Sequence, residues 1–214
     1  MKKSEKIFVI GKKLTKAFIF AFALLPLSLS LLVSGMVIDR FKLGDYAIII
    51  ISITFLVIWF LFIPNMARWR QHWDISEQYF EHYAVDGYFQ QLKYILSIFN
   101  GNEDMFAFKI KLTEIKSIRL YWNTVWIISS TPLHSIYFGI TLKDGSIVTF
   151  RSLLTTSNRE YIDAVNYLNE KCNIQIEDKY NLLGAMENPG MRLAEYIDKI
   201  EKQEGKWRTK NDQS

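Results

Sequence analysis

Two uncharged apolar runs decide the fold: AFIFAFALLPLSLSLLVSGMVI at residues 17–38 and YAIIIISITFLVIWFLFI at residues 46–63. Runs of about 18 or more apolar residues match the hydrocarbon core of a bilayer, which is about 30 Å thick. The loop DRFKLGD at residues 39–45 separates them. The sequence therefore predicts a transmembrane hairpin of two helices, with one folded domain attached behind it.

The positive charge of the chain lies beside the predicted hairpin. The formal net charge is +4, and six lysines with a single glutamate precede the first apolar run. Residues 74–214 hold 16 Lys and Arg against 19 Asp and Glu. Nucleic-acid binding needs a basic face on the folded domain, so this distribution argues against a nucleic-acid partner. The basic flank instead suits an anionic lipid bilayer.

Lys and Arg near the spans predict their orientation. The loop holds only Arg40 and Lys42, and more basic residues flank the outer ends of the hairpin. We therefore expect a multi-pass protein of the cell membrane with both termini in the cytoplasm. No small-residue cleavage site follows the first run, so a retained span is favoured over a signal peptide. The predicted interface anchors are Lys12, Lys13, Lys16, Trp59, Arg68, Trp69, Arg70 and Trp73.

Both predicted spans lack the ionisable residues that mark ion paths and proton relays, which argues against a transporter core. Pro64 is expected to end the second helix. Pro26 is expected to kink the first, with Ser28 and Ser30 satisfying freed backbone groups. Ser30 and Ser34 have the small-residue spacing that lets helices approach closely. Packing within the hairpin explains this spacing, and association with another membrane protein or a second copy (a homo-oligomer) is the alternative.

Alternating apolar and polar residues predict a mainly antiparallel β domain at residues 74–172. Asp144-Gly145 between two β-rich runs predicts a two-residue hairpin turn, which places Gly139 opposite Phe150. The runs expected as strands are residues 74–85, 88–99, 105–112, 115–122, 125–129, 135–143 and 146–152, of which residues 88–99 also fit a helix.

Two amphipathic helices are expected after these strands. Ser157 and Glu160 have the spacing of a capping box, and the apolar stripe that follows ends at Cys172. A second helix is expected at residues 191–203. The predicted organisation is a basic cytoplasmic amino terminus (1–16), the transmembrane hairpin (17–63), the β domain (74–172), a carboxyl-terminal extension (173–204) and a polar tail (205–214).

Strands followed by one capped helix resemble the order of a pleckstrin-homology-like (PH-like) fold. The stretches that carry the resemblance are the hairpin at residues 17–63, LTEIKSIRLYW at 112–122 and ITLKDGSIVTFRSLLTTSNREYIDAVNYLNEK at 140–171. Together they resemble bacterial membrane-anchored proteins in which two spans precede a PH-like domain. The resemblance implies an α+β fold, with a helix capping an antiparallel β-barrel or sandwich. Members that bind phosphoinositides use Lys and Arg between the first two strands, whereas residues 78–91 carry neither.

No pattern of catalytic or metal-ligating residues stands out. His72, His82 and His134 lie in separate segments without a metal-ligand spacing. No phosphate-binding glycine loop and no nucleophile motif occurs. The single cysteine, Cys172, excludes an intrachain disulfide. We therefore expect a protein that is not an enzyme and that has no metal or cofactor.

Docking of a protein partner by the cytoplasmic domain is the function that these observations favour. The candidate interaction surface comprises Tyr121, Trp122, Trp126 and Tyr196, for which core packing is the alternative. Two other functions stay open. One is an immunity factor against a membrane-active bacteriocin, because small basic membrane proteins with PH-like domains resemble such factors. The other is an accessory subunit of a transporter or envelope complex.

Overall fold

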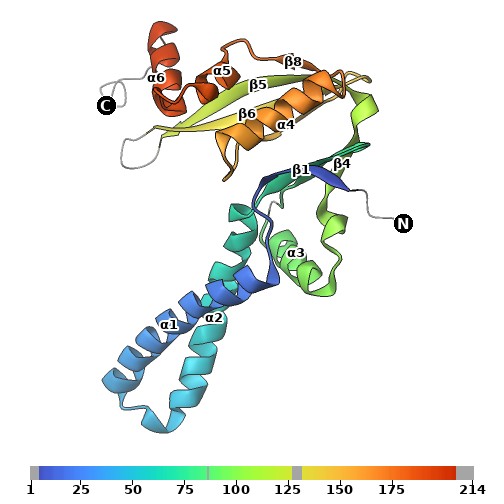
Figure 1. The fold of residues 1–214 in the computed structure, drawn as a ribbon. Helices are drawn as coiled ribbons and strands as arrows, with labels where there is room; N and C mark the ends of the chain where they lie inside the picture. The colour runs from blue at the N-terminus through green and yellow to red at the C-terminus, as the bar shows by residue number, and fades with distance from the viewer. Residues whose placement is uncertain (1–4, 86, 127–131, 206–214) are drawn as a thin grey trace. The chain divides into compact units, whose positions relative to one another are not determined.

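The computed structural model describes residues 5–85, 87–126 and 132–205. The chain forms two compact units (Figure 1). The helical unit comprises Lys12–His72 and His82–Phe108, and the strand unit comprises the residues up to Gly11, Trp73–Glu81 and the residues from Lys109 onward. Each unit has its own buried apolar cluster. The predicted α+β class is therefore confirmed.

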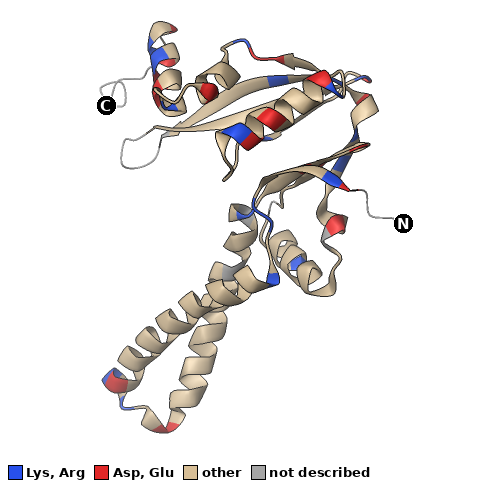
Figure 2. Cartoon of the chain, viewed as in Figure 1, with Lys and Arg blue, Asp and Glu red and all other residues tan. Residues whose placement is uncertain are grey.

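The helical unit begins with the two helices predicted from the apolar runs. Helix α1 (Lys16–Phe41) starts after Thr15, whose hydroxyl accepts a hydrogen bond from the N–H of Phe18. A 3-10 turn, η1 (Gly44–Tyr46), leads into α2 (Ala47–Trp69). Charged residues lie at the two ends of this hairpin and not along its length (Figure 2). Both helices are long and apolar enough to cross a membrane.

The second helix passes through Pro64 instead of ending there. Proline lacks the N–H that would bond the carbonyl oxygen four residues earlier, which belongs to Phe60. The hydroxyl of Tyr88 donates a hydrogen bond to that oxygen at 2.8 Å. The expectation that Pro64 ends the helix is therefore wrong, because another side chain satisfies the freed carbonyl group.

Pro26 also lies inside its helix, α1, without ending it. The serines that follow do not take the role expected of them. Ser28 and Ser30 donate to the carbonyl oxygens of Leu25 and Leu27, at 2.9 and 2.7 Å. The carbonyl that the proline frees lies at residue 22, one turn earlier, so these hydroxyls bond other groups.

A helix, α3 (Tyr88–Asn100), occupies the segment first expected as a strand, so the helical alternative is confirmed. Its buried Tyr94, Ile95 and Ile98 lie one, three and four residues apart, on one face of the helix. Burial of that face decides between two conformations that the composition allows. A 3-10 turn, η2 (Glu103–Phe106), follows where a strand was expected to begin.

A four-stranded sheet has the order β1-β2-β3-β4. Two of its strands replace the single strand expected at residues 74–85, because Ser76 and Tyr79 close a tight turn in which the Tyr79 N–H donates to Ser76 Oγ at 3.1 Å. The strands are β1 (Lys6–Gly11), β2 (His72–Ser76), β3 (Tyr79–Tyr83) and β4 (Phe108–Lys111).

Strand β1 comes from the basic amino-terminal segment, where no strand was expected. The Lys6 ammonium group pairs with the carboxylate of Asp74, whose side chain is 1% exposed. Glu81 lies 3.5 Å from Lys6 and 2.7 Å from Lys109. Buried carboxylates need such partners, so at least one lysine of this segment balances the charge of a buried carboxylate in the strand unit.

The second sheet has the order β7-β6-β5-β8, with β8 parallel to β5. One long strand, β5, covers both residues 115–122 and the start of the expected strand at 125–129, and residues 127–131 lie outside the described residues. Among the described strands the two sheets form no closed barrel, so the expected barrel is not observed. The strands are β5 (Ile115–Trp126), β6 (Pro132–Leu142), β7 (Ile147–Arg151) and β8 (Gln175–Glu177).

The hairpin between β6 and β7 has a three-residue connection instead of the predicted two-residue one. The Leu142 N–H donates to the carbonyl of Ser146 at 2.9 Å, and Gly145 has a φ of +89°. One residue with positive φ suits a three-residue loop, whereas the predicted type I′ turn needs two. Gly139 consequently lies opposite Thr149, one position from the partner predicted for it.

Helix α4 (Asn158–Glu170) begins at the predicted capping box, where Ser157 Oγ accepts from the N–H of Glu160 at 3.2 Å. The ring of Tyr161 lies 5.9 Å from that of Phe138 in β6, which joins the helix to the core of the strand unit. Tyr161, Val165 and Leu168 of the predicted stripe are buried, whereas Cys172, expected to end the stripe, lies beyond the helix and is partly buried.

Two short helices complete the strand unit. Helix α5 (Leu182–Glu187), which the sequence did not predict, is capped by Asp178, whose carboxylate accepts from the N–H groups of Leu182 and Leu183, both at 2.8 Å. Helix α6 (Leu193–Gln203) confirms the predicted terminal helix and begins two residues later than expected. Its Ile197 is fully buried.

Candidate functional site

The inward face of the β5–β6 ribbon changes from apolar to polar toward one end. Alternate residues of a strand share a face, and the polar pair on the inward face is Thr124 with His134. Helix α6 packs beside β6 in the same unit. The apolar pairs that precede it are Ile118 with Ile140, Leu120 with Phe138 and Trp122 with Ile136.

Five side chains from β5, β6 and α6 form one hydrogen-bonded group, which we call the His134 cluster. The Trp122 Nε1–H donates to Glu201 Oε1 at 2.7 Å, and Thr124 Oγ1 lies 2.5 Å from the same oxygen. His134 Nδ1 lies 2.8 Å from Thr124 Oγ1, and His134 Nε2 lies 2.8 Å from Asp198 Oδ1. The side chain of His134 is 3% exposed and that of Asp198 is 28% exposed.

These contacts require one proton more than a neutral imidazole and two carboxylates supply. Thr124 has a single hydroxyl proton. If that proton bonds Glu201, then His134 Nδ1 must donate to Thr124, and Nε2 needs a second proton to bond Asp198. If it bonds His134 instead, the contact between Thr124 and Glu201 needs a protonated carboxyl group. All of these contacts can therefore be hydrogen bonds at once only with one added proton, and a cation among the same atoms would remove that need.

A hydroxyl, an imidazole and a carboxylate in contact are also the parts of a nucleophilic triad. In a triad the hydroxyl hands its proton to the imidazole. Thr124 Oγ1 instead lies between two polar groups and is closer to Glu201, at 2.5 Å, than to His134, at 2.8 Å. This geometry favours holding a proton or a cation over nucleophilic attack.

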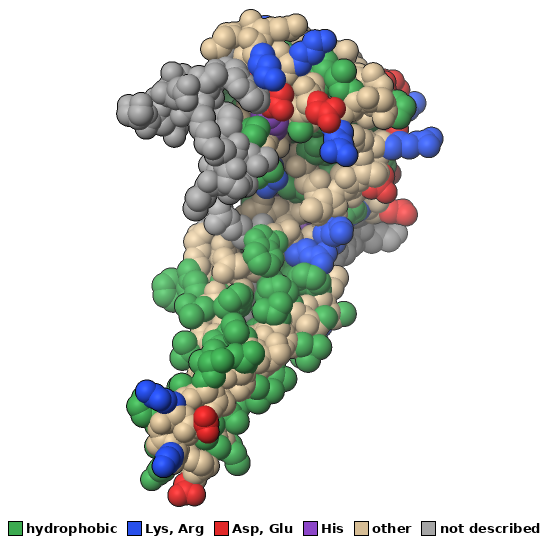
Figure 3. Space-filling view, turned by 90° about the vertical axis from the view of Figure 1, so that its left-hand side faces the viewer, with side chains coloured by type: hydrophobic (Ala, Val, Ile, Leu, Met, Phe, Trp, Pro, Cys, Tyr) green, Lys and Arg blue, Asp and Glu red, His purple; other side chains and the backbone are tan. Residues whose placement is uncertain are grey.

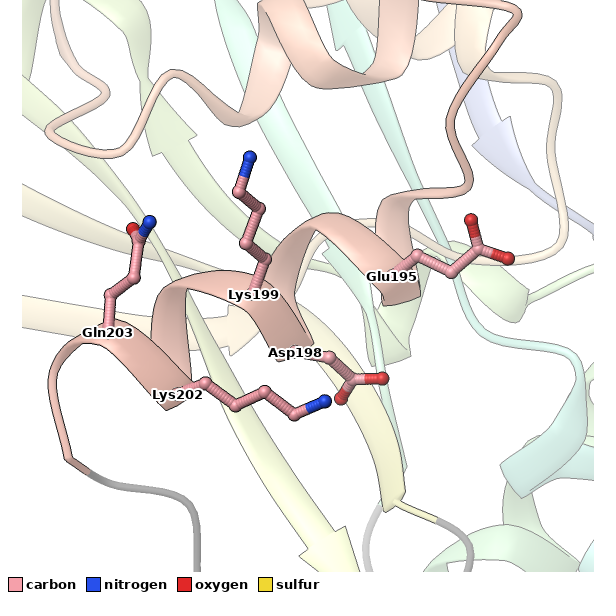
Figure 4. A pocket seen from close by; sticks show the side chains of 5 residues that line it. All are labelled: Glu195, Asp198, Lys199, Lys202 and Gln203. Atoms are coloured by element: carbon pink, nitrogen blue, oxygen red, sulfur yellow. The ribbon is translucent and has the colours of Figure 1, made fainter.

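A shallow hollow of about 350 Å³ lies along α6 and reaches the edge of the His134 cluster. Asp198 belongs to both, and its side chain and that of Lys202 extend toward one another (Figure 4). Solvent therefore reaches the cluster through Asp198. The side chains that line the hollow are those of Glu195, Asp198, Lys199, Lys202 and Gln203.

Sequence reasoning missed this cluster because His134 and Asp198 are 64 residues apart and neither shows a ligand spacing. One local signal was present. Glu201 lies four residues after the buried Ile197 on the apolar face of α6, and it is itself buried. An acidic residue at such a position needs a polar partner from another element.

The four aromatic residues predicted as a docking surface lie in different environments. Tyr121 is on the outward face of the ribbon, where the centre of its ring lies 5.7 Å from that of the stacked Tyr137 ring. Trp122 faces inward, and its ring lies 4.7 Å from that of Tyr180. The Tyr196 hydroxyl donates to the carbonyl of Tyr180 at 2.9 Å. The side chain of Trp126 lies outside the described residues.

Most of the predicted interface anchors belong to the helical unit. Trp69 is 61% exposed. The Arg70 guanidinium group lies 3.6 Å from the ring centre of Phe18, and the Lys16 ammonium group donates to the carbonyl of Phe99 at 3.1 Å. Lys12 and Lys13 are exposed, Trp59 is partly buried, and the side chain of Arg68 lies outside the described residues.

Trp73 differs from the other predicted anchors. It is fully buried in the core of the strand unit, with its ring 5.3 Å from that of Phe80. Its Nε1–H donates to the carbonyl of Ser152 at 2.7 Å. The expectation that Trp73 anchors the chain at a membrane interface is therefore wrong, because its whole side chain belongs to the core.

No family model matches the chain, and no curated protein or solved structure matches it.

Proposed function

We propose that the chain is a non-enzymatic integral membrane protein. The hairpin of α1 and α2 crosses the bilayer, both termini lie in the cytoplasm, and the strand unit is a PH-like module that docks a protein partner.

The exposure of α2 is the observation that carries the proposal. None of the residues in the most apolar 18-residue stretch of α2 is buried, and 22% of the residues in the corresponding stretch of α1 are buried. A core helix of a soluble protein buries its apolar face, and soluble proteins rarely expose apolar patches larger than a few hundred Å². Apolar side chains cover the face of the hairpin seen in Figure 3. Strongly exposed examples are Phe20, Leu24, Met36, Ile48 and Leu61.

Basic residues support the proposed orientation. Lys12, Lys13 and Lys16 precede α1, and Arg70 follows α2, at the end opposite the loop. Cytoplasmic flanks carry an excess of Lys and Arg in membrane proteins. A protease added outside intact cells should therefore leave the strand unit uncut, and digestion of that unit would contradict the orientation. The protein should stay with the membrane after an alkaline wash, and its release would contradict insertion.

The outward face around Tyr121 supports the docking role. The Arg119 guanidinium group lies 5.5 Å from the Tyr121 ring centre. Gly139 lies beside this ring, since a Cβ built on it would be in ordinary contact with Tyr121 Cε1 at 3.5 Å. Tyrosine and arginine are enriched at the centres of protein interfaces. These residues suit a partner that presents a carboxylate beside an apolar group.

Photo-crosslinking in intact membranes tests the docking role. A photoreactive amino acid in place of Tyr121 should join the chain to one partner protein. The matched control carries the same amino acid in place of Asp163, an exposed residue of α4. An identical set of products from both positions, or none from Tyr121, would contradict docking at this face.

A further inference from the structure

We propose that His134, Asp198 and Glu201 bind a divalent transition-metal ion of the zinc type, which joins α6 to β6. The ligands would be Nε2 of His134 and one carboxylate oxygen from each acidic residue. This inference goes beyond docking and does not depend on it.

The distances between the donor atoms suit such an ion. One ligand atom from each of the three residues lies within 4.8 Å of the other two. Zinc binds imidazole nitrogen and carboxylate oxygen at about 2.0–2.2 Å, which separates the ligands of a tetrahedral site by roughly 3.4 Å. His134 Nε2 and Asp198 Oδ1 are 2.8 Å apart. A metal ion between them needs a modest increase of that distance and a small inward movement of Glu201.

The surrounding hydrogen bonds are those of a metal site. A ligating histidine almost always donates its second ring N–H to an oxygen, which fixes the ring. His134 Nδ1 faces Thr124 Oγ1 at 2.8 Å. Ligating carboxylates are hydrogen-bonded in their turn, and Glu201 Oε1 accepts from Trp122 and contacts Thr124. Strand β5 thus supplies outer hydrogen bonds for two of the three ligands, His134 from β6 and Glu201 from α6.

Charge and donor type select the class of ion. A neutral imidazole with two carboxylates carries two negative charges, and Glu201 is buried while Asp198 borders the hollow along α6. Magnesium and calcium prefer oxygen ligands alone, whereas one imidazole suits zinc and its neighbours. Three protein ligands leave one coordination position, which water from the hollow can fill. The positive charge of Lys202, whose side chain extends toward Asp198, weakens the attraction of the carboxylates for a cation. The bond between the ion and His134 Nε2 therefore contributes more of the affinity.

Calorimetric titration of the full-length protein in detergent micelles tests the site. The protein must carry no histidine tag and must first be treated with a chelator. Zinc chloride should bind with one ion per chain, because the three ligand atoms form a single group. Magnesium chloride should not compete. Asp198→Asn and His134→Gln should each weaken zinc binding by about 10-fold or more, by analogy with the losses seen when a metal site is perturbed.

Glu195→Gln is the matched control, since it removes an exposed carboxylate from the same helix outside the cluster. It should leave zinc affinity unchanged. Circular dichroism of each variant checks that the chain is folded. If His134→Gln unfolds the protein, Asp198→Asn still tests the site, because it keeps the shape of a side chain that is partly exposed. Absence of zinc binding by the wild type overturns the proposal. So does equal affinity of the wild type and Asp198→Asn, which would show that Asp198 is not a ligand of the ion.

Discussion

The hydroxyl group of Tyr88 donates a hydrogen bond to the carbonyl oxygen of Phe60 at 2.8 Å. Phe60 lies four residues before Pro64, so this oxygen is the one that a proline in α2 leaves without its helical donor. A residue at the start of α3 thus completes the backbone bonding of α2. The helix continues to Trp69 as a result.

Tyr88→Phe should destabilise the helical unit by about 1 kcal/mol, the usual net contribution of one hydrogen bond. In a Pro64→Ala background the same change should cost less, because alanine restores the N–H donor to Phe60. Denaturant titration in detergent micelles measures both costs, with Tyr46→Phe at an exposed tyrosine as control. Equal costs in the two backgrounds would show that Tyr88 does not compensate for the proline.

Trp73→Phe should lower the free energy of unfolding by about 2 kcal/mol. The change leaves the buried carbonyl of Ser152 without its donor and opens space in the core. Trp69→Phe, at an exposed tryptophan, should stay within about 0.5 kcal/mol of the wild type. If Trp73 instead anchored the chain at a membrane interface, the two variants would have similar effects on stability.

The turn between β6 and β7 should carry an unusually acidic carboxyl group. The Ser146 hydroxyl and the Ser146 N–H, which donate to Asp144 Oδ1 at 2.7 and 2.8 Å, lower the pKa of Asp144 below its usual value. A lowered pKa adds stability above the unfolded pKa, and this is lost as the pH falls through the folded value. Carboxyl NMR titration should show the low pKa in the wild type. Ser146→Ala should raise it toward normal, and an unchanged pKa would contradict the assignment to the hydroxyl.

His82 should make the helical unit sensitive to mild acid. Burial lowers the pKa of its imidazole to about 4, from the 6.5 of an exposed histidine. Below pH 6.5 the unfolded chain takes up a proton that the folded chain does not, so stability falls as the pH falls toward 4 and is fully present above 6.5. The loss between about pH 7 and about pH 5 should be about 2 kcal/mol.

His82→Gln removes the titrating group and should flatten this part of the stability profile. The free energy of unfolding is measured by denaturant titration at about pH 7 and about pH 5. Other groups contribute equally to both proteins, so the difference between the two profiles isolates His82. Parallel profiles would mean that His82 is not buried as a neutral imidazole.

Several features followed from single segments of sequence. The α1–α2 hairpin follows from two uncharged apolar runs, because each supplies enough length for a long helix without a neighbour. The start of α4 follows from Ser157 and Glu160, whose contact spans three residues. The position of the β6–β7 hairpin follows from Asp144-Gly145 between two β-rich runs, and Gly145 does have a positive φ. The register between β6 and β7 did not follow from the sequence, because the loop between them has one residue more than predicted.

Other features depend on residues that meet only in the folded chain. Composition allowed strand or helix at α3, and burial of Tyr94 and Ile98 selected the helix. The edge strand β1 places Lys6 beside the buried Asp74, which is 68 residues away in the sequence. Buried charges and freed backbone groups need partners, and those partners come from distant segments that no local pattern joins.

The sequence by itself therefore determined the two long apolar helices, the α+β class and the capped helix α4, because each signal lies within one stretch of chain. Only the tertiary structure decided that α2 continues through Pro64, since Tyr88 is 28 residues from its acceptor on Phe60. It likewise decided that His134 meets Asp198 across 64 residues, where two strands and a helix bring an imidazole and two carboxylates together.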